Sequence, residues 1–224
     1  WLKSAKKGKK LVDLNNNIKC GNSLIDDPEV AGERAFGWAA EFRGIMDGAG
    51  FDVIVGNPPY VFGGNSGIKK GEKDYYYKSY LIAKGKVNLF SLFIEKSLSL
   101  LRDCGRFSFI IPNTFLRVTS YHEDRKLLLQ KSRLLEVVTL DNNVFQDATT
   151  TAIIFVAEKS EKNNDNITAI YDKINGNYLP IKQGDFISND YLISLGYTSG
   201  ASEMIKKFSV NTISLGEICK ELIF

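Results

Sequence analysis

The chain has 224 residues, enough for one ordinary domain with an appendage or for two small domains around a substantial core. Hydrophobic residues make up 44% and charged residues 25%, a composition that excludes an intrinsically disordered polymer. The net charge of +3 neither requires nor excludes a polyanionic partner, because nucleic acid responds to clustered charge rather than to the total.

The first part of the chain predicts a short strand, a helix and a buried strand. Residues 16–25 (NNIKCGNSLI) begin as a short strand and end in a Gly-Asn-Ser turn. Pro28 opens a helix that we predict over residues 28–46, where apolar side chains recur. Residues 51–55 (FDVIV) show no polar alternation, which is typical of a central parallel strand covered on both faces.

A glycine- and lysine-rich stretch follows at residues 62–86 and contains four tyrosines. It is too long for a simple connection, so a binding loop or a disordered lid is favoured. Its glycines lack the Gly-Lys-Ser/Thr of a phosphate-binding loop.

The second part of the chain alternates helices and strands. Residues 88–103 predict the clearest helix, with apolar residues on one side and Gly105 as its stop. The segments that follow are a strand at 106–112, a helix at 121–132, a strand from 134 and a strand at 149–159. This order predicts a doubly wound α/β sheet. The connection through residues 141–143 is too short for a helix, so the last strand is expected to run antiparallel.

The strand at 51–55 ends in Gly56-Asn57-Pro58-Pro59-Tyr60. Ligands of open α/β sheets bind beyond the carboxyl ends of the strands. Pro58 biases Asn57 towards an extended conformation, so the asparagine is presented with little freedom. The Asn57 amide oxygen and the Pro58 carbonyl would form two adjacent acceptors beside the flat ring of Tyr60. That arrangement suits a planar ligand with an exocyclic amine, and stacking worth roughly 1–3 kcal/mol would offset much of the cost of extruding a base such as adenine.

The Gly-Asn-Pro-Pro-Tyr segment resembles the (D/N/S)PP(Y/F/W) signature of S-adenosylmethionine-dependent amino-methyltransferases, in particular N6-adenine DNA methyltransferases. The segments IKCGNSLI, NLFSLFIEKSLSLL, GRFSFIIPNTFL and TTAIIFV occur in the same order in the Eco57I-like branch, in which a methylase is fused to a restriction endonuclease in a type IIG polypeptide. The resemblance covers about residues 15–159. It implies a partial doubly wound Rossmann-like methyltransferase sheet, mostly parallel with the last strand antiparallel, and a small C-terminal extension.

The resemblance also implies a role for each residue of the motif. Asn57 and Pro58 accept hydrogen bonds from the N6 amine of the target base, Pro59 helps to keep the turn stiff, and Tyr60 stacks on an adenine flipped out of double-stranded DNA. Phe90 falls in the segment that helps to form the target-base pocket, although core packing explains it as well.

The cofactor implied by the resemblance is S-adenosylmethionine, with Asn22 and Gly56 as binding residues. An ordinary turn asparagine is an equally good interpretation of Asn22. The glycine-rich cofactor turn of the family is not found upstream of residue 16. In the family the first strands lie between the strand ending at Cys20 and the strand ending at Val55, so we expect residues 1–25 to be displaced or to pair with another copy.

Both ends of the sequence look cut, so we expect a fragment of a longer protein. Because the cofactor turn and the first strands of the family are missing, we expect the fragment alone to bind cofactor poorly and to turn over slowly or not at all. Residues 1–160 are predicted to be the C-terminal part of a methyltransferase catalytic domain, and residues 161–224 a linker and the start of a target-recognition region. The segment ISLGEICKEL resembles the entry helix of such a region. No nuclease centre is recognised in the sequence.

Cysteine and histidine are scarce and widely spaced. Cys20, Cys104 and Cys219 form no Cys-x-x-Cys pair, and His122 is the only histidine. The pattern argues against a metal site. With no secretory signal and no apolar stretch of spanning length, we expect a cytoplasmic protein of a bacterium or archaeon that has no membrane partner. The basic cluster at residues 3–10 is interpreted as a solvated tail.

Two other functions stay open from the sequence. A methyltransferase that modifies the glutamine side chain of release factors would act on a similar planar amide with the same motif. A non-catalytic DNA-binding module could instead use the tyrosine- and lysine-containing residues 69–86 as a stacking surface.

Overall fold

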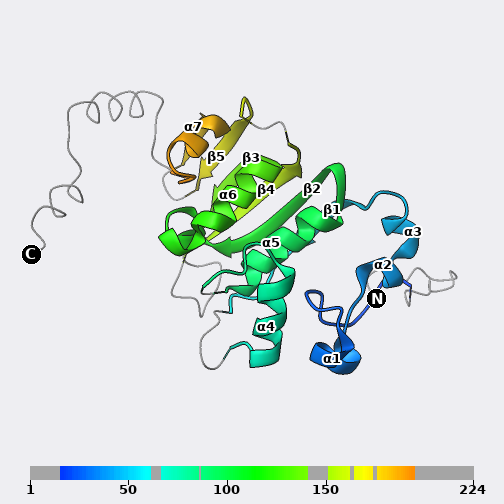
Figure 1. The fold of residues 1–224 in the computed structure, drawn as a ribbon. Helices are drawn as coiled ribbons and strands as arrows, with labels where there is room; N and C mark the ends of the chain where they lie inside the picture. The colour runs from blue at the N-terminus through cyan, green and yellow to red at the C-terminus, as the bar shows by residue number, and fades with distance from the viewer. Residues whose placement is uncertain are drawn as a thin grey trace, which may run out of the picture.

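The structure is a computed structural model that describes residues 16–61, 67–85, 87–140, 151–161, 164–173 and 176–194 (Figure 1). The α-helices are α1 (Pro28–Ala31), α2 (Trp38–Glu41), α3 (Arg43–Met46), α4 (Lys70–Ser79), α5 (Leu89–Leu100), α6 (His122–Lys131) and α7 (Gln183–Ser188). The 3-10 turns are η1 (Gly32–Arg34), η2 (Asn113–Leu116) and η3 (Thr119–Tyr121). The strands are β1 (Phe51–Gly56), β2 (Leu101–Pro112), β3 (Ser132–Thr139), β4 (Ala152–Lys159), β5 (Ile167–Asp172) and β6 (Asn177–Lys182).

The strands form one six-stranded sheet in the order β1-β2-β4-β3-β5-β6. β1 pairs parallel with β2, and β3 pairs parallel with β5, whereas β4 runs antiparallel to both β2 and β3. β6 runs antiparallel to β5. Four strands therefore share one direction and β4 and β6 oppose it. The prediction of an α/β sheet whose strand at 149–159 enters antiparallel is confirmed.

The main core lies between the sheet and helices α5 and α6, which cover one face of it (Figure 1). Along β2, Phe107, Phe109 and Ile111 are buried, because alternate side chains of a strand point to the same face. Phe109 pairs with Phe155 of β4 in register, and their rings lie 6.1 Å apart. The helices at 88–103 and 121–132 are confirmed as α5 and α6 and supply the other half of this core.

The predicted helix at 88–103 ends earlier than expected, at Leu100. Leu101 already pairs with Phe51 of β1, so the chain enters β2 there rather than after Gly105. The register between β1 and β2 shifts between Phe51 and Val53, and Cys104 adopts a φ of 58° in the irregular part. A bulged strand gives no period-2 signal at its start, which is why the helical pattern seemed to continue.

β1 stands at one edge of the sheet, paired with β2 alone among the residues that the structure describes. Val53 and Val55 are 60% and 77% exposed. The prediction of a parallel strand is confirmed, but the prediction of a central strand covered on both faces is wrong for this structure. An apolar run indicates that a strand can be buried, but it does not identify which neighbouring element covers the strand.

The segment before β1 differs from its prediction. Residues 16–21 form no strand, and the described part of residues 16–25 lies outside the sheet, with a single parallel bridge between Asn22 and Ala35. The expected displacement of residues 1–25 stays a prediction, because residues 1–15 lie outside the described part of the chain. Residues 28–46 form α1, η1, α2 and α3 rather than one helix.

The break in the predicted helix at 28–46 has a local cause. Gly32 has φ +60° and ψ −138°, a conformation open to glycine and not to other residues. The aromatic residues that predicted a helix pack on one another instead. The rings of Trp38 and Phe42 both contact the ring of Phe51 at the start of β1, with centroids 5.8 Å and 5.6 Å from it. The segment thus buries its apolar side chains by clustering rather than along one helix face.

A second, smaller core joins the segment before β1 to α4. It contains Leu24, Ile25, Tyr76, Tyr80 and Val87, all buried. The interpretation of residues 62–86 as a loop or lid is therefore wrong for much of the stretch, because residues 70–79 form α4 and both Tyr76 and the following Tyr80 are buried. Residues 62–66 and 86 lie outside the described part of the chain.

The sheet continues past residue 160. Ile170 of β5, Ile181 of β6 and Phe186 of α7 belong to the main core. The buried Gln183 side chain donates to the carbonyls of Leu129 and Ser132, which ties α7 to the end of α6. The domain boundary at 160 stays a prediction. The segment ISLGEICKEL, the basic residues 3–10, the turn at 141–143 and Cys219 lie outside the described residues.

Candidate active site

The Asn-Pro-Pro-Tyr segment leaves the sheet at the carboxyl end of β1. Gly56 pairs with Phe109 of β2, and a Cβ at position 56 would lie 2.9 Å from a carbon of the Phe109 ring. The missing side chain lets the end of β1 rest on that ring. Asn57 and Pro59 are exposed, whereas Pro58 is buried. Pro58 therefore anchors the turn and Asn57 stands in the open.

Tyr60 is fixed at both ends of its side chain. Its hydroxyl donates to the carbonyl oxygen of Ile110 in β2 at 2.9 Å. Its ring meets the ring of Phe90 edge-on, with centroids 6.4 Å apart and planes at 88°. Burial raises the pKa of the Tyr60 hydroxyl, so the group remains a neutral donor. The residue keeps 37% of its surface exposed, so a ligand can still reach it.

Phe90 is fully buried in the main core. Its ring lies 6.0 Å from Phe115 and 5.3 Å from Tyr121, in addition to its contact with Tyr60. The structure thus brings Phe90 together with the motif and places it behind Tyr60 rather than at the surface. Core packing accounts for these contacts, and direct contact of Phe90 with a target base stays a prediction.

Asn88 and Tyr121 complete the support behind Tyr60, and the sequence reasoning missed both. Asn88 caps α5 by accepting from the Phe90 amide at 3.3 Å, and its amide group donates to the Tyr121 hydroxyl at 3.2 Å. One residue further on, the Leu89 amide donates to the carbonyl of Val61, which follows the motif directly. Asn88 was detectable, because an asparagine just before an amphipathic helix is a typical N-cap. Tyr121 carries no local signal for this contact.

A buried carboxylate lies next to this support. Asp124 of α6 is 6% exposed and lines a cavity of about 50 Å³ together with Asn88 and Ser91. Burial raises the pKa of Asp124 to about 7, against the opposing effects of the nearby Ser91 hydroxyl and the charge of Arg125. The negative charge of Glu123 acts in the same direction as burial. Asp124 can therefore change its charge within the ordinary range of pH.

Replacing Asp124 by asparagine is expected to stabilise the chain at neutral and alkaline pH. The unfolded carboxyl loses its proton at about pH 4 and the buried one only near pH 7, so the wild type loses stability as pH rises through that window. The neutral amide removes this loss. The free energy of unfolding of D124N should exceed that of the wild type by about 2–4 kcal/mol at about pH 8.

Urea denaturation at several pH values measures this difference. At about pH 4 both side chains are neutral, so the two proteins should have similar stability there, which serves as the internal control. A difference between D124N and wild type that stays constant from about pH 4 to pH 8 would show that Asp124 does not titrate in this window.

The predicted cofactor residue Asn22 lies in a different part of the structure. Its side-chain oxygen accepts from the Leu24 amide at 3.2 Å, and its side chain lies near Tyr76 of α4, where it lowers the pKa of the hydroxyl. Burial nevertheless raises the pKa of Tyr76 to about 12. No hydrogen bond or ring contact among the described residues joins Asn22 to the Asn-Pro-Pro-Tyr segment. The turn interpretation of Asn22 accounts for these contacts.

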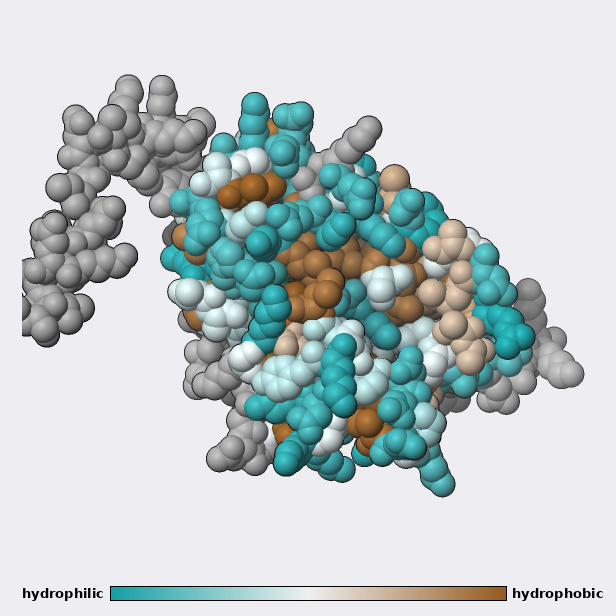
Figure 2. Space-filling model, viewed as in Figure 1, coloured by the Kyte–Doolittle hydropathy of each residue, from teal (hydrophilic) through white to brown (hydrophobic). Residues whose placement is uncertain are grey.

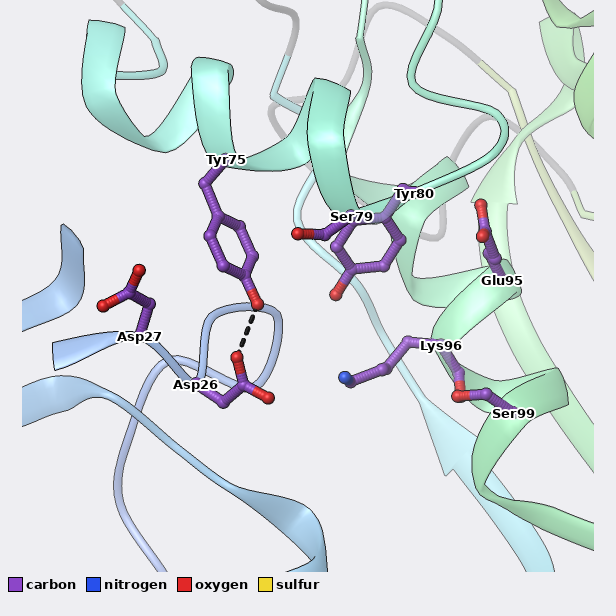
Figure 3. Close-up of a pocket in the computed structure, with 8 residues that line it drawn as sticks. All are labelled: Asp26, Asp27, Tyr75, Ser79, Tyr80, Glu95, Lys96 and Ser99. Atoms are coloured by element: carbon purple, nitrogen blue, oxygen red, sulfur yellow. Dashed lines mark hydrogen bonds between the residues drawn. The ribbon is translucent and has the colours of Figure 1, made fainter. Parts of the chain in front are cut away.

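A polar cavity of about 600 Å³ opens beside the turn that follows Asn22 (Figure 3). Tyr75 of α4 points across it and donates to Asp26 at 2.6 Å, and Lys96 of α5 extends its ammonium group into it. The complete lining is Asp26, Asp27, Tyr75, Ser79, Tyr80, Glu95, Lys96 and Ser99. The three carboxylates are partly engaged already, since Glu95 accepts from two backbone amides and Asp27 caps α1.

The described residues do not by themselves fit S-adenosylmethionine. Asn22 already bonds its neighbours, the Cβ position of Gly56 is filled by the Phe109 ring, and neither residue lines the polar cavity. Within the same residues, no cluster of three or more His, Cys, Asp or Glu could hold a metal ion. Nor does this part of the chain contain a helix long and apolar enough to cross a membrane.

Solved structures share this fold. The type IIG restriction endonuclease BpuSI matches 66% of this chain and 21% of its own with a TM-score of 0.51 and 17% identity. A DrdV–DNA complex matches 69% of this chain and 18% of its own with a TM-score of 0.51 and 15% identity. Identities this low establish the fold alone. The sheet therefore has a Rossmann-like α/β fold.

Sequence relatives define the family. Residues 1–145 match the family described as Eco57I restriction-modification methylase. The chain is 31% identical over 161 residues to the type II restriction enzyme and methyltransferase RM.Eco57I of Escherichia coli, covering 70% of this chain and 16% of that protein. It is 35% identical over 133 residues to the type II methyltransferase M.TthHB8I of Thermus thermophilus, covering 57% and 31%. The chain belongs to the Eco57I restriction-modification methylase family, and the resemblance inferred from its motifs is confirmed.

Proposed function

We propose that this chain is the part of a restriction-modification protein that methylates the N6 amine of adenine in DNA, with S-adenosylmethionine as the methyl donor. The observation that carries the proposal is the exposed Asn57, held by a buried Pro58 at the carboxyl end of β1, with the half-exposed ring of Tyr60 beside it. The chain spans at most 31% of the two curated relatives named above, so the activity of a whole protein is part of the proposal.

The chemistry assigned to the motif is to bind and orient an amine. The Asn57 side-chain oxygen and the Pro58 carbonyl each accept a hydrogen bond from one N–H of the amine. These two bonds draw the nitrogen lone pair out of conjugation with the purine ring. Tyr60 provides the stacking surface, and its bond to Ile110 and its contact with Phe90 keep the ring in place. These groups need no covalent intermediate. S-adenosylmethionine, when bound, supplies the methyl group.

Cofactor contacts must come in part from residues outside the described ranges, because the described ones do not form a pocket for it. The family supports the donor: its named members are methyltransferases. Members of the family and structures of the same fold include proteins that carry a restriction activity, and one of the matched structures is a complex with DNA. These relationships support DNA as the substrate and do not favour the release-factor alternative.

The test is to find which atom receives the methyl group. The natural protein that carries this sequence is incubated with isotopically labelled S-adenosylmethionine and mixed-sequence duplex DNA, and the digested nucleosides are separated by mass spectrometry. N6-methyladenine is expected. Label on cytosine would overturn the adenine assignment, and label on the glutamine of an added release factor, with none on DNA, would overturn the substrate class.

A second function is favoured by one observation, the absence of a cofactor pocket among the described residues. A chain of this length could bind DNA without methylating it. Salt-dependent DNA binding together with no calorimetric signal for S-adenosylmethionine would identify that state.

A further inference from the structure

Helix α4 presents lysines and a tyrosine to solvent on one face. Lys70, Lys73 and Tyr77 recur at i, i+3 and i+7, and Lys69 precedes them at the N-cap; these four residues are called the lysine face below. Tyr76, on the other side of the helix, is buried in the smaller core. The surface over α4 is mostly hydrophilic (Figure 2).

Positive charge exceeds negative charge in and around α4. Residues 69–85 contain five lysines and two carboxylates, an excess of three that equals the net charge of all 224 residues. In the described ranges none of these five lysines forms an ion pair, whereas Arg102 pairs with Asp52 and Arg106 with Glu158. The carboxylate of Glu72 is turned to the Lys69 backbone amide, at 3.2 Å, rather than to a lysine side chain.

The position of the lysines is unfavourable for the helix itself. The N-terminus of a helix carries a partial positive charge, so acidic side chains stabilise the first turn and basic ones destabilise it. Lys69, Lys70 and Lys73 nevertheless lie at or next to the first turn of α4. Favourable interaction with the helix dipole therefore does not account for these charges.

The lysine face is also ordered by its own contacts. The Lys73 ammonium lies 5.6 Å from the centre of the Tyr77 ring, a cation–π arrangement. The Tyr77 hydroxyl donates to the Gly85 carbonyl at 2.6 Å, and the residue stays 40% exposed. An aromatic ring next to lysines that have no carboxylate partner is an arrangement that binds nucleic acid.

The C-terminal end of α4, opposite to Lys69 and Lys70, and the Asn-Pro-Pro-Tyr segment are both connected to α5. The chain leaving Tyr60 is bound to the N-terminus of α5 through Val61 and Leu89, and the chain leaving α4 reaches that N-terminus within nine residues. The Glu95 carboxylate of α5 holds this connection by accepting from the amides of Leu81 and Ile82. A DNA strand that delivers a base to Asn57 would therefore have its backbone near α4.

We propose that the lysine face of α4 binds the phosphates of the DNA strand next to the target base. The proposal rests on the proposed function, since it names the surface that holds the substrate of that site. Lys69, Lys70 and Lys73 contact phosphate oxygens, and Tyr77 supports Lys73 and packs against the sugar-phosphate chain. Contacts of this kind position a strand and carry no sequence information.

The double variant K70Q/K73Q tests the surface, with K173Q/K182Q as the matched control. The control removes the same charge from two exposed positions, Lys173 directly after β5 and Lys182 at the end of β6, at the opposite edge of the sheet from β1. Binding to an unmodified duplex is measured by fluorescence anisotropy over a range of salt concentrations, without S-adenosylmethionine. The slope of log affinity against log salt should fall by about 2 in K70Q/K73Q, and affinity should drop roughly tenfold or more at low salt. The control should behave as wild type.

Steady-state methylation separates this inference from the proposed function. K70Q/K73Q is expected to raise KM for DNA and to leave kcat unchanged, because the lysine face does not touch the reacting amine. If K70Q/K73Q methylates DNA with the salt slope and the KM of the wild type, the lysine face does not bind phosphates. The proposed function would not be affected by that result. A third outcome combines two results: K70Q/K73Q loses DNA affinity, and the wild-type protein methylates only added protein and no DNA. That outcome would support the lysine face and overturn the proposed function. Equal losses in both double variants would show a general charge effect and overturn the inference.

Discussion

Replacing Asn57 by alanine is expected to lower the rate of DNA methylation about 10²–10³-fold, with little change in DNA affinity. The size follows from the loss of one preorganised polar contact to the reacting group, which typically costs that much in a water-excluded site. Affinity should persist because Asn57 is one exposed side chain, whereas phosphate contacts dominate binding to DNA. Single-turnover methylation and anisotropy measure the two quantities.

Two further variants make the Asn57 experiment specific. Aspartate at position 57 keeps an acceptor oxygen at the same place, so N57D should retain more activity than N57A. N189A removes an exposed asparagine from the end of α7 and should leave methylation at the wild-type rate. If N57A methylates DNA as fast as the wild type does, Asn57 does not hold the target amine and the mechanism proposed for the motif is wrong.

Replacing Arg125 by methionine is expected to lower the free energy of unfolding by about 3–5 kcal/mol. Arg125 is 1% exposed, and its guanidinium donates to three carbonyl oxygens, those of Tyr191, Phe115 and Val118, each at 2.8 Å. Burial lowers the pKa of Arg125, and the nearby Asp124 opposes that effect. Methionine has a similar volume but no donor, so all three carbonyls lose their partner.

The expected loss of stability is large because Arg125 joins separate elements. It ties α6 to the turn after β2 and to residues 190–191, which both have positive φ values, 53° and 59°, and so need an external hold. Urea denaturation followed by circular dichroism gives the stability. R117M, which changes an exposed arginine in the same turn, is the matched control and should lie within about 0.5 kcal/mol of wild type. An R125M protein as stable as R117M would show that the three bonds contribute nothing net.

The sequence allowed prediction of the elements whose own pattern defines them. α5 and α6 carry an apolar face, and β2, β3 and β4 carry apolar runs between clear turns, so their type was predicted and confirmed. The antiparallel entry of β4 followed from a connection too short for a helix. What the sequence could not show is which strand lies next to which, since β1 reads as a central strand and stands at the edge.

The candidate site divides in the same way. The Asn-Pro-Pro-Tyr turn was recognisable because proline and glycine fix the local backbone, and the structure places that turn at the end of β1 as expected. Its supporting residues depend on contacts between distant segments: Asn88 meets Tyr121 over 33 positions, and Tyr60 meets Ile110 over 50. No local pattern encodes such pairs. Asn22 shows the converse, a motif-like position that the structure joins to a different core.

Within the described chain, β2 is the only strand that pairs with β1 and so supports the motif from the sheet. It pairs with β1 on both sides of the register shift between Phe51 and Val53, its Phe109 supports Gly56, and its Ile110 carbonyl holds Tyr60. A strand bonded along one side keeps torsional freedom about that side, so the twist of β2 sets the angle at which Asn57 and Pro58 are presented. Substitutions that alter the coiling of β2 would therefore change the direction of the Asn57 side-chain oxygen and the Pro58 carbonyl, although neither residue is replaced.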